Sequence, residues 1–306
     1  MKHTVIMFAA LAVLGATASP AAAGLTPQKV IGGPGSQYWP SSNGNYVAWS
    51  DGRKRLARIF VTEPGTGDRA MVNRPGTDSN LGSFIQGTNE LIYQEYSGTR
   101  SDLYYYDAAS GDRRKAPKTV NAPGFEYWPQ GSQRFLLFLR ATNRFRTRAL
   151  FLYDRAADHQ RRLVSSIARN RTIYPGFVGE RYAAWTTCNG EFCTISVYDD
   201  STHVVDTLPR PPGKADYAPA IDEASGHLYF VRSQANHCGR GVTIRQGTLG
   251  TTESVTLLAL PRGIDTGWNT SLTTDAGSGF LDIYFERWNC RQRSADIYAL
   301  RSINAP

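Results

Sequence analysis

The stretch YAAWTTCNGEFCTISVYDD, residues 182–200, holds two short runs of aromatic, β-branched and small residues on either side of an Asn-Gly turn. An Asn-Gly pair between two such runs is a strong signal for a β-hairpin. Both runs have counterparts along the chain. The first column reads YVAWS from residue 46, LIYQE from 91, LLFLR from 136, YAAWT from 182, LYFVR from 228 and IYFER from 283. The second column reads IFVTE from 59, LYYYD from 103, LFLYD from 150, ISVYD from 195, VTIRQ from 242 and IYALR from 297.

The hairpin is therefore one copy of an internal repeat that occurs six times, at a spacing of about 47 residues, which is the length of a four-stranded propeller blade. The last copy has room for only three strands, and Gln28–Ile31 precedes the first copy without a partner. We therefore predict an all-β protein, a six-bladed β-propeller of four-stranded antiparallel blades. The N-terminal strand is expected to close the last blade, which removes exposed sheet edges.

The turns and strand ends of the repeat resemble those of the TolB-like six-bladed propellers. That family repeats a turn like Ser-Pro-Asp-Gly, an apolar strand, and a strand that ends in an apolar-Tyr-x-x-Asp pattern. Here the first repeat has SSNG at residues 41–44, and the third strand of three repeats ends in Asp107, Asp154 and Asp199. The resemblance covers essentially all of the chain after residue 23. It implies the fold and a general binding character.

The first 23 residues are typical of a secretory signal peptide. Lys2 precedes an apolar run from Val5 to Leu14, and Ala21-Ala22-Ala23 fits a small-residue cleavage site. We expect cleavage after Ala23 and one propeller domain over residues 24–306. The product would be secreted, or periplasmic if the source has an outer membrane. Cleavage would leave 283 of 306 residues and lower the formal net charge from +8 to +7. No later segment is apolar for long enough to span a membrane.

All four cysteines lie after the expected cleavage site, so disulfides are the first interpretation in an exported chain. A zinc site fits less well, because the spacings do not match paired ligand knuckles. Cys188 and Cys193 flank the turn of one hairpin, within disulfide reach. Cys238 and Cys290 fall in the corresponding hairpins of adjacent blades. Of three possible pairings we predict Cys188–Cys193 and Cys238–Cys290.

Charge is predicted to differ between the two ends of the propeller. Successive strands alternate in direction, so the hairpins that join second to third strands share one end with the entrances to the first strands. We call this end the basic face, because its hairpins include RATNRFRTR at residues 140–148. The other end collects EPGTGD, DAASGD and DRAADH and is called the acidic face. The candidate ligand-binding residues of the basic hairpins are Arg53, Arg55, Arg144, Phe145, Arg146, Arg148, Arg240, Arg287, Trp288 and Arg291.

Aromatic residues recur where the first strands begin, on the same face. The candidates there are Tyr38, Trp39, Tyr127, Trp128, Tyr217 and Trp268. Aromatic faces near cations suit sugars or peptides that bear acidic groups. The alternative is structural: recurrent aromatics pack between blades, and hairpin arginines are solvated.

No catalytic motif is present: there is neither a Gly-x-Ser-x-Gly elbow nor a glycine-rich phosphate loop. The three aspartates that end third strands are predicted to accept backbone hydrogen bonds in the following turn. We expect no cofactor, no metal, no nucleic-acid partner and a monomer. The predicted function is non-catalytic binding of an anionic polysaccharide, cell-wall polymer or acidic protein on the basic face. A polysaccharide lyase or hydrolase is the alternative, and a protein–protein scaffold at the cell envelope is a third interpretation.

Overall fold

The structure is a computed structural model, which describes most of the chain after the expected signal peptide. The described residues are 25–33, 35–52, 56–98, 100–142, 147–164, 171–235, 238–267, 270–275 and 280–304. The signal-peptide prediction lies outside them. So do six of the candidate ligand-binding residues, namely Arg53, Arg55, Arg144, Phe145, Arg146 and Trp268.

The described residues are all-β and contain no helix, so none of them forms a helix that could cross a membrane. The strands, in chain order, are β1 (Gln28–Ile31), β2 (Gln37–Ser42), β3 (Val47–Asp51), β4 (Arg58–Thr62), β5 (Ala70–Met71), β6 (Asp78–Phe84), β7 (Glu90–Ser97), β8 (Arg100–Asp107), β9 (Arg113–Lys115), β10 (Phe125–Gly131), β11 (Phe135–Thr142), β12 (Thr147–Asp154), β13 (His159–Val164), β14 (Arg171–Val178), β15 (Tyr182–Asn189), β16 (Phe192–Asp199), β17 (Val204–Thr207), β18 (Lys214–Asp222), β19 (His227–Gln234), β20 (Thr243–Thr248), β21 (Ser254–Ala259), β22 (Ile264–Asp265), β23 (Thr270–Asp275), β24 (Phe280–Asn289) and β25 (Ser294–Asn304).

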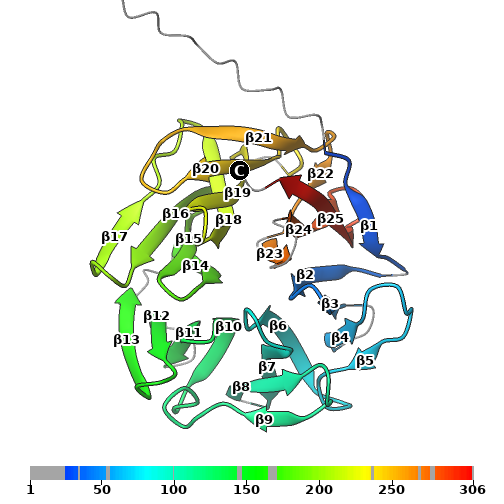
Figure 1. Cartoon of the computed structure of the whole chain (residues 1–306), viewed down its shortest axis with the longest axis vertical. Helices are drawn as coiled ribbons and strands as arrows, with labels where there is room; N and C mark the ends of the chain where they lie inside the picture. The colour runs from blue at the N-terminus through cyan, green and yellow to red at the C-terminus, as the bar shows by residue number, and fades with distance from the viewer. Residues whose placement is uncertain are drawn as a thin grey trace, which may run out of the picture.

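The sheets follow one another around a ring, which is a propeller-like arrangement (Figure 1). The expectation of six separate four-stranded sheets needs correction, because the described strands pair into five sheets. Three of these have four strands: β2–β5, β14–β17 and β18–β21. The second and third repeats form one eight-stranded sheet, because a parallel bridge between Phe125 and Ser101 joins β10 to β8. The last sheet has five strands, because the first strand of the last repeat is divided into β22 and β23.

The N-terminal strand pairs with the last strand of the chain, as expected from the sequence. Strand β1 runs antiparallel to β25, with Gln28 opposite Ala299 and Lys29 opposite Tyr298. An ion pair of 2.6 Å between the Lys29 ammonium and the Asp296 carboxylate adds to the pairing. The outer edge of the last sheet is therefore formed by the beginning of the chain.

The repeated third strands place one aliphatic residue each at the same buried position. These residues are Ile59, Leu103, Leu150, Ile195, Ile244 and Ile297, all with no exposed surface. Burying such a side chain stabilises a fold by about 1.5–3 kcal/mol. The periodic apolar pattern of the sequence thus corresponds to a core that is divided among the repeats.

The first strands of several repeats contain a β-bulge, and this bulge shapes the basic face. The pairing register shifts after Tyr38 in β2, after Tyr127 in β10 and after Tyr217 in β18. The next residue, Trp39, Trp128 or Ala218 respectively, has a φ of 52–53°, the left-handed region that non-glycine residues rarely adopt. A bulge of this kind turns one backbone N–H away from its own sheet.

The N–H that the bulge releases is bonded to a side chain of the preceding repeat. The Ala218 N–H donates to Thr186 Oγ1 at 3.2 Å. In the second repeat, the N–H of Leu81, beside the register shift, donates to Ser50 Oγ at 3.1 Å. In the first repeat, the N–H of Trp39 donates to Glu286 Oε2 at 3.0 Å. Ser50, Thr186 and Glu286 occupy the same position of the second strand, so this position joins neighbouring repeats.

Candidate functional site

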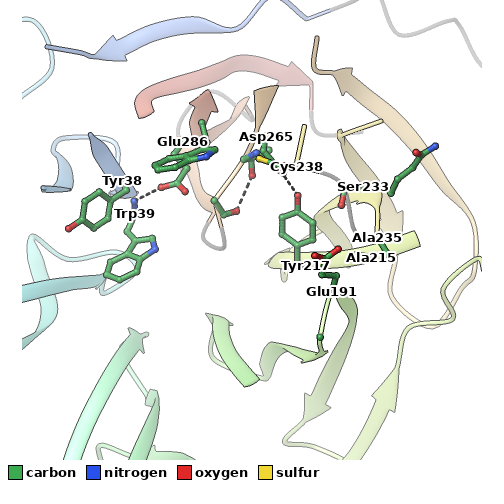
Figure 2. Close-up of a pocket in the computed structure, with 15 residues that line it drawn as sticks. Tyr38, Trp39, Glu191, Ala215, Tyr217, Ser233, Ala235, Cys238, Asp265 and Glu286 are labelled. Carbon is green, nitrogen blue, oxygen red and sulfur yellow. Dashed lines mark hydrogen bonds between the residues drawn. The ribbon is translucent and has the colours of Figure 1, made fainter. Parts of the chain in front are cut away.

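A cavity of about 460 Å³ opens on the basic face between the first, fifth and sixth repeats. Figure 2 shows that its side chains come from strands far apart in the sequence. Four of the predicted aromatic residues line it: Tyr38 and Trp39 of β2, Tyr217 of β18 and Trp288 of β24. The structure therefore brings these four candidates together in one cavity, which the sequence did not define.

Asp265 lies at the end of β22, and three donors hold its carboxylate in place. The Tyr217 hydroxyl donates to Oδ1 at 2.8 Å, and the backbone N–H groups of Thr266 and Gly239 donate at 2.7 and 3.0 Å. Tyr217 is only 4% exposed, and burial raises the pKa of its hydroxyl well above the usual value. The hydroxyl therefore stays protonated and available as a donor to Asp265.

Glu286 is the most unusual group of the cavity, because it is a buried carboxyl without a cation. It is 6% exposed, and no lysine, arginine or histidine of the described chain lies within ion-pair distance. Burial raises the pKa of this carboxyl to about 7, and the N–H of Trp39 opposes that rise only in part. The side chain points toward Trp39, whose N–H donates to Oε2 (Figure 2).

A second hollow, of about 850 Å³, lies next to the cavity on the same face. Its charged side chains are Arg240, Arg262 and Arg291, and we call it the arginine hollow. All three arginines are exposed. In the part of the chain that the structure describes, none of them lies within ion-pair distance of a carboxylate. Cys238 lines both the hollow and the cavity, so its disulfide forms part of the wall between them.

Both predicted disulfides are present. Cys188 and Cys193 are directly opposite on β15 and β16, with 4.0 Å between their Cα atoms. Cys238 and Cys290 join the hairpins of the fifth and sixth repeats, with 6.0 Å between their Cα atoms. Two disulfides in one chain fit an oxidising compartment.

Other candidates of the basic face have structural positions. Tyr127 is 6% exposed and belongs to the core, and Trp128 stacks on Tyr174 with 4.9 Å between ring centroids. These two aromatic side chains pack against their neighbours and do not line the cavity. Arg148 is half-buried, and the guanidinium of Arg287, also half-buried, lies over the Tyr298 ring at 5.2 Å.

The first arginine of RATNRFRTR is also structural. Arg140 lies on β11, where its guanidinium donates to Glu126 Oε1 at 2.8 Å and to the Val120 carbonyl at 2.6 Å. Both members of this ion pair are buried. The charge of Arg140 is therefore neutralised inside the fold and does not contribute to the surface of the basic face.

The acidic face holds its arginines in ion pairs. Asp200 contacts Arg134 at 2.9 Å and Arg161 at 3.0 Å, and Asp199 contacts Arg181 at 2.6 Å. The three aspartates that end third strands accept backbone hydrogen bonds from the following turn, as predicted from the sequence. The donors are the N–H groups of Ala109 and Ser110 for Asp107, of Ala156 and Ala157 for Asp154, and of Ser201 for Asp199.

Comparisons with known proteins give a consistent result at the level of the fold. No protein-family model and no curated protein matches the chain. Among solved structures, TolB from Acinetobacter baumannii is 13% identical over 90% of this chain, with a TM-score of 0.56, and this chain spans 66% of its length. A TolB-type protein from Agrobacterium tumefaciens is 12% identical over 88% of this chain and 91% of its own, with a TM-score of 0.58. The chain has the TolB-like propeller fold.

The same TolB-like arrangement occurs in an enzyme. An oligogalacturonate lyase in complex with manganese is 10% identical over 89% of this chain and 83% of its own, with a TM-score of 0.50. Such a likeness concerns the fold and not the chemistry. In this TolB-like propeller, the described residues bring together one group of metal-type ligands, Cys238, Asp265 and Cys290. Its two sulfurs are bonded to each other, so neither is a thiolate that could bind a metal.

Sequence reasoning missed three residues of the cavity and the arginine hollow: Asp265, Glu286 and Arg262. The aligned repeats could not have revealed Glu286, because the column places Arg287, and not Glu286, beside Ser50 and Thr186. Only the strand pairing of the structure brings Glu286 to their position. Asp265 and Arg262 precede the last aligned run in a segment without a repeated pattern, so no sequence signal marks them.

Proposed function

We propose that this protein is a secreted, single-domain, six-bladed propeller that binds an anionic ligand on its basic face without chemical conversion. The six-bladed count is supported by the repeat. It divides the eight-stranded sheet into β6–β9 and β10–β13, and among the described strands these two groups pair with each other only at the bridge between Phe125 and Ser101. Secretion is supported by the signal-like N-terminus and by the two disulfides.

The observation that carries the binding proposal is the arginine hollow. Arg240, Arg262 and Arg291 are exposed, line one hollow and meet no carboxylate among the described residues. Like charges that share a hollow repel one another, and an anion placed between them relieves that repulsion. Guanidinium groups bind carboxylates, phosphates and sulfates through paired hydrogen bonds. The net positive charge of the protein would also raise the rate of encounter with anions.

Among anions, an anionic glycan fits this face best. Aromatic side chains lie in the adjoining cavity, and aromatic faces stack on sugar rings as well as on other apolar groups. Acidic peptides and inorganic polyanions share the charge but make less use of the aromatic wall. We therefore propose a polymer of acidic sugars as the preferred ligand class.

The test compares two triple variants that remove the same charge. R240S/R262S/R291S removes the charge of the arginine hollow, whereas R69S/R162S/R301S removes three exposed arginines from elsewhere on the surface. Binding of polygalacturonate, poly-L-glutamate and polyphosphate is measured by calorimetry at two salt concentrations. We expect the hollow variant to bind polygalacturonate at least about tenfold more weakly, with a flatter salt dependence, and the control to change less than about threefold.

Equal losses in both variants would show that only net charge matters and would contradict the proposal. Stronger binding of polyphosphate or poly-L-glutamate than of polygalacturonate would replace the glycan by that ligand class. Cleavage of the polygalacturonate during incubation, followed by absorbance of unsaturated products and by reducing ends, would establish the alternative of a lyase or hydrolase.

A further inference from the structure

The cavity beside the arginine hollow has the opposite charge. Asp265, Glu286 and Glu191 line it, and its described lining contains no lysine, arginine or histidine. The remaining walls are largely aromatic, from Tyr38, Trp39, Tyr217 and Trp288. Among the described residues, a ligand group that enters this cavity therefore meets carboxyl oxygens and aromatic rings, and no cationic side chain.

The charge of Glu286 is not required for joining the repeats. At the same position, Ser50 and Thr186 each accept a backbone N–H from the next repeat through a neutral hydroxyl. Glu286 does the same for Trp39 with one oxygen, Oε2. Its second oxygen, Oε1, accepts no hydrogen bond among the described residues. A buried carboxylate without a counter-charge costs folding free energy, so the fold itself gives no reason for a carboxyl here.

The backbone beside Glu286 leaves space for this side chain. A Cβ atom at residue 267 would lie 1.5 Å from Glu286 Oε1 and 2.6 Å from its Cγ, so a larger residue there would displace the carboxyl from this position. Gly267 lines the cavity together with Glu286. Two positions far apart in the sequence are thus matched to hold one carboxyl at the cavity wall.

We propose that this cavity binds the primary ammonium group of a ligand, with Glu286 as its ionic partner and the surrounding aromatic rings as its walls. Glu286 Oε1 accepts no hydrogen bond among the described residues. The N–H groups of an ammonium group can donate to it. Cations are attracted to the faces of tryptophan and tyrosine rings, more strongly where water is excluded. The cavity volume lies within the usual range for sites that bind small molecules or peptide ends. Asp265, held by its three donors, adds negative potential to the same cavity.

Two sources of a primary ammonium group are compatible with this chemistry: the α-amino group of a peptide and the amino group of an amino sugar. Each source has an acetylated form that keeps the shape and removes the charge. Trialanine amide is therefore compared with N-acetyl-trialanine amide, and glucosamine with N-acetylglucosamine. Binding is measured by calorimetry with the full protein.

We expect saturable binding of at least one amine, at least about tenfold weaker binding of its acetylated form, and a similar loss in E286Q. The glutamine keeps an acceptor for the Trp39 N–H, and a melting curve checks that the variant is folded. E253Q removes an exposed carboxylate elsewhere and serves as the matched control, with less than about twofold change expected. Whichever of the two amines, the peptide or the amino sugar, loses more affinity on acetylation and in E286Q is then identified as the source of the ammonium group.

Several outcomes would overturn the proposal. These are equal binding of the amine and its acetylated form, binding of neither amine, and equal affinities of wild type and E286Q for the amine. The acetylated ligands test the proposal on the wild-type protein alone, so a folding defect in the variant would not obscure the result. The inference is independent of the arginine hollow, because R240S/R262S/R291S is expected to keep its affinity for the amine within about twofold.

Discussion

The acidic face and the arginine hollow of this propeller use the same residue types in opposite ways. On the acidic face, Arg134, Arg161 and Arg181 are each paired with Asp199 or Asp200. On the basic face, the three arginines of the arginine hollow have no carboxylate partner among the described residues, although carboxyls lie in the neighbouring cavity. The proposed ligand site therefore differs from the acidic face in that its arginines and carboxyls are not paired with one another. The number of charged side chains is not what distinguishes the two.

The pKa values of two carboxyls also differ between the acidic face and the cavity: one is lowered and the other is raised. The hydrogen bond from Arg181 holds the pKa of Asp199 well below its usual range. Burial, together with the negative charge of nearby Asp265, raises the pKa of Glu286 to about 7. The comparison predicts that disturbing the paired face changes stability, whereas disturbing the arginines of the unpaired face changes binding. Four measurements test or refine it.

The largest effect is expected from the disulfide at the basic face. Replacing Cys238 and Cys290 by serine removes a bridge between residues 52 positions apart. Loop-closure entropy predicts a loss of about 4 kcal/mol, compared with about 2 kcal/mol for C188S/C193S, whose bridge closes a much shorter loop. Denaturant unfolding under oxidising conditions measures both. A smaller loss for C238S/C290S than for C188S/C193S would show that the long bridge does not restrict the unfolded chain.

The second effect concerns the carboxyl without a cation. A carboxyl whose pKa is higher in the folded than in the unfolded chain binds more protons when folded, so stability falls as pH rises between the two values. For Glu286 this window runs from 4.5 to about 7. E286Q is therefore expected to be more stable than wild type at pH 8, by up to about 3 kcal/mol, and similar to it at pH 4. Unfolding curves across this range measure the difference, and a constant difference at all pH values would contradict the assignment.

The third effect tests the paired face. Asp200 is 8% exposed and contacts both Arg134 and Arg161. D200N should lower stability by about 1–2 kcal/mol, because solvent screens the half-exposed arginines while the carboxylate itself is buried. D68N, at an exposed carboxylate of the same face, is the control and should change stability by less than about 0.5 kcal/mol. Equal effects of the two variants would mean that the ion pairs of the acidic face contribute little.

The smallest effect is the sharpest test of the comparison. R240S/R262S/R291S should change the free energy of unfolding by less than about 0.5 kcal/mol, or raise it slightly as the repulsion among the three charges is removed. Thermal melts at low and high salt measure this. A loss as large as that of D200N would place these arginines among the structural ion pairs and contradict their availability to a ligand.

Much of the architecture could be predicted from the sequence, because each repeat encodes its strands locally. The alternation of apolar and polar residues set the strand positions, and the hairpin positions of the cysteines were enough for both disulfides. Tyr38, Trp39 and Tyr217 were candidates because aromatic residues recur where the first strands begin, but Tyr127 and Tyr38 could not be distinguished. Their surroundings depend on the neighbouring repeats. In β10 the aromatic residues pack inside the fold, whereas in β2 the same pattern opens on the cavity.

The surroundings of the charged side chains were predicted less well. A side chain on a strand can face either of the two sides of its sheet, and the arginine-rich stretch did not show which. Arg140 belongs to an arginine-rich stretch, yet its position on β11 directs it toward Glu126. The partners of Glu286 and Asp265 come from repeats on both sides of the ring closure. Such contacts follow from how the ring closes and not from any local pattern, so they become visible only in three dimensions.

The pairing of β1 with β25 has a consequence for how the protein is made. The two strands lie at opposite ends of the described chain, so the last sheet cannot be completed before nearly the whole polypeptide has been synthesised. Contacts between distant parts of a chain form slowly, because their loop-closure entropy is lost before they are stabilised. Until they pair, β1 and β25 each present an unpaired edge that other strands can join. A chain that lacked β25 would leave β1 without this partner, so the pairing of these two strands closes the ring of sheets.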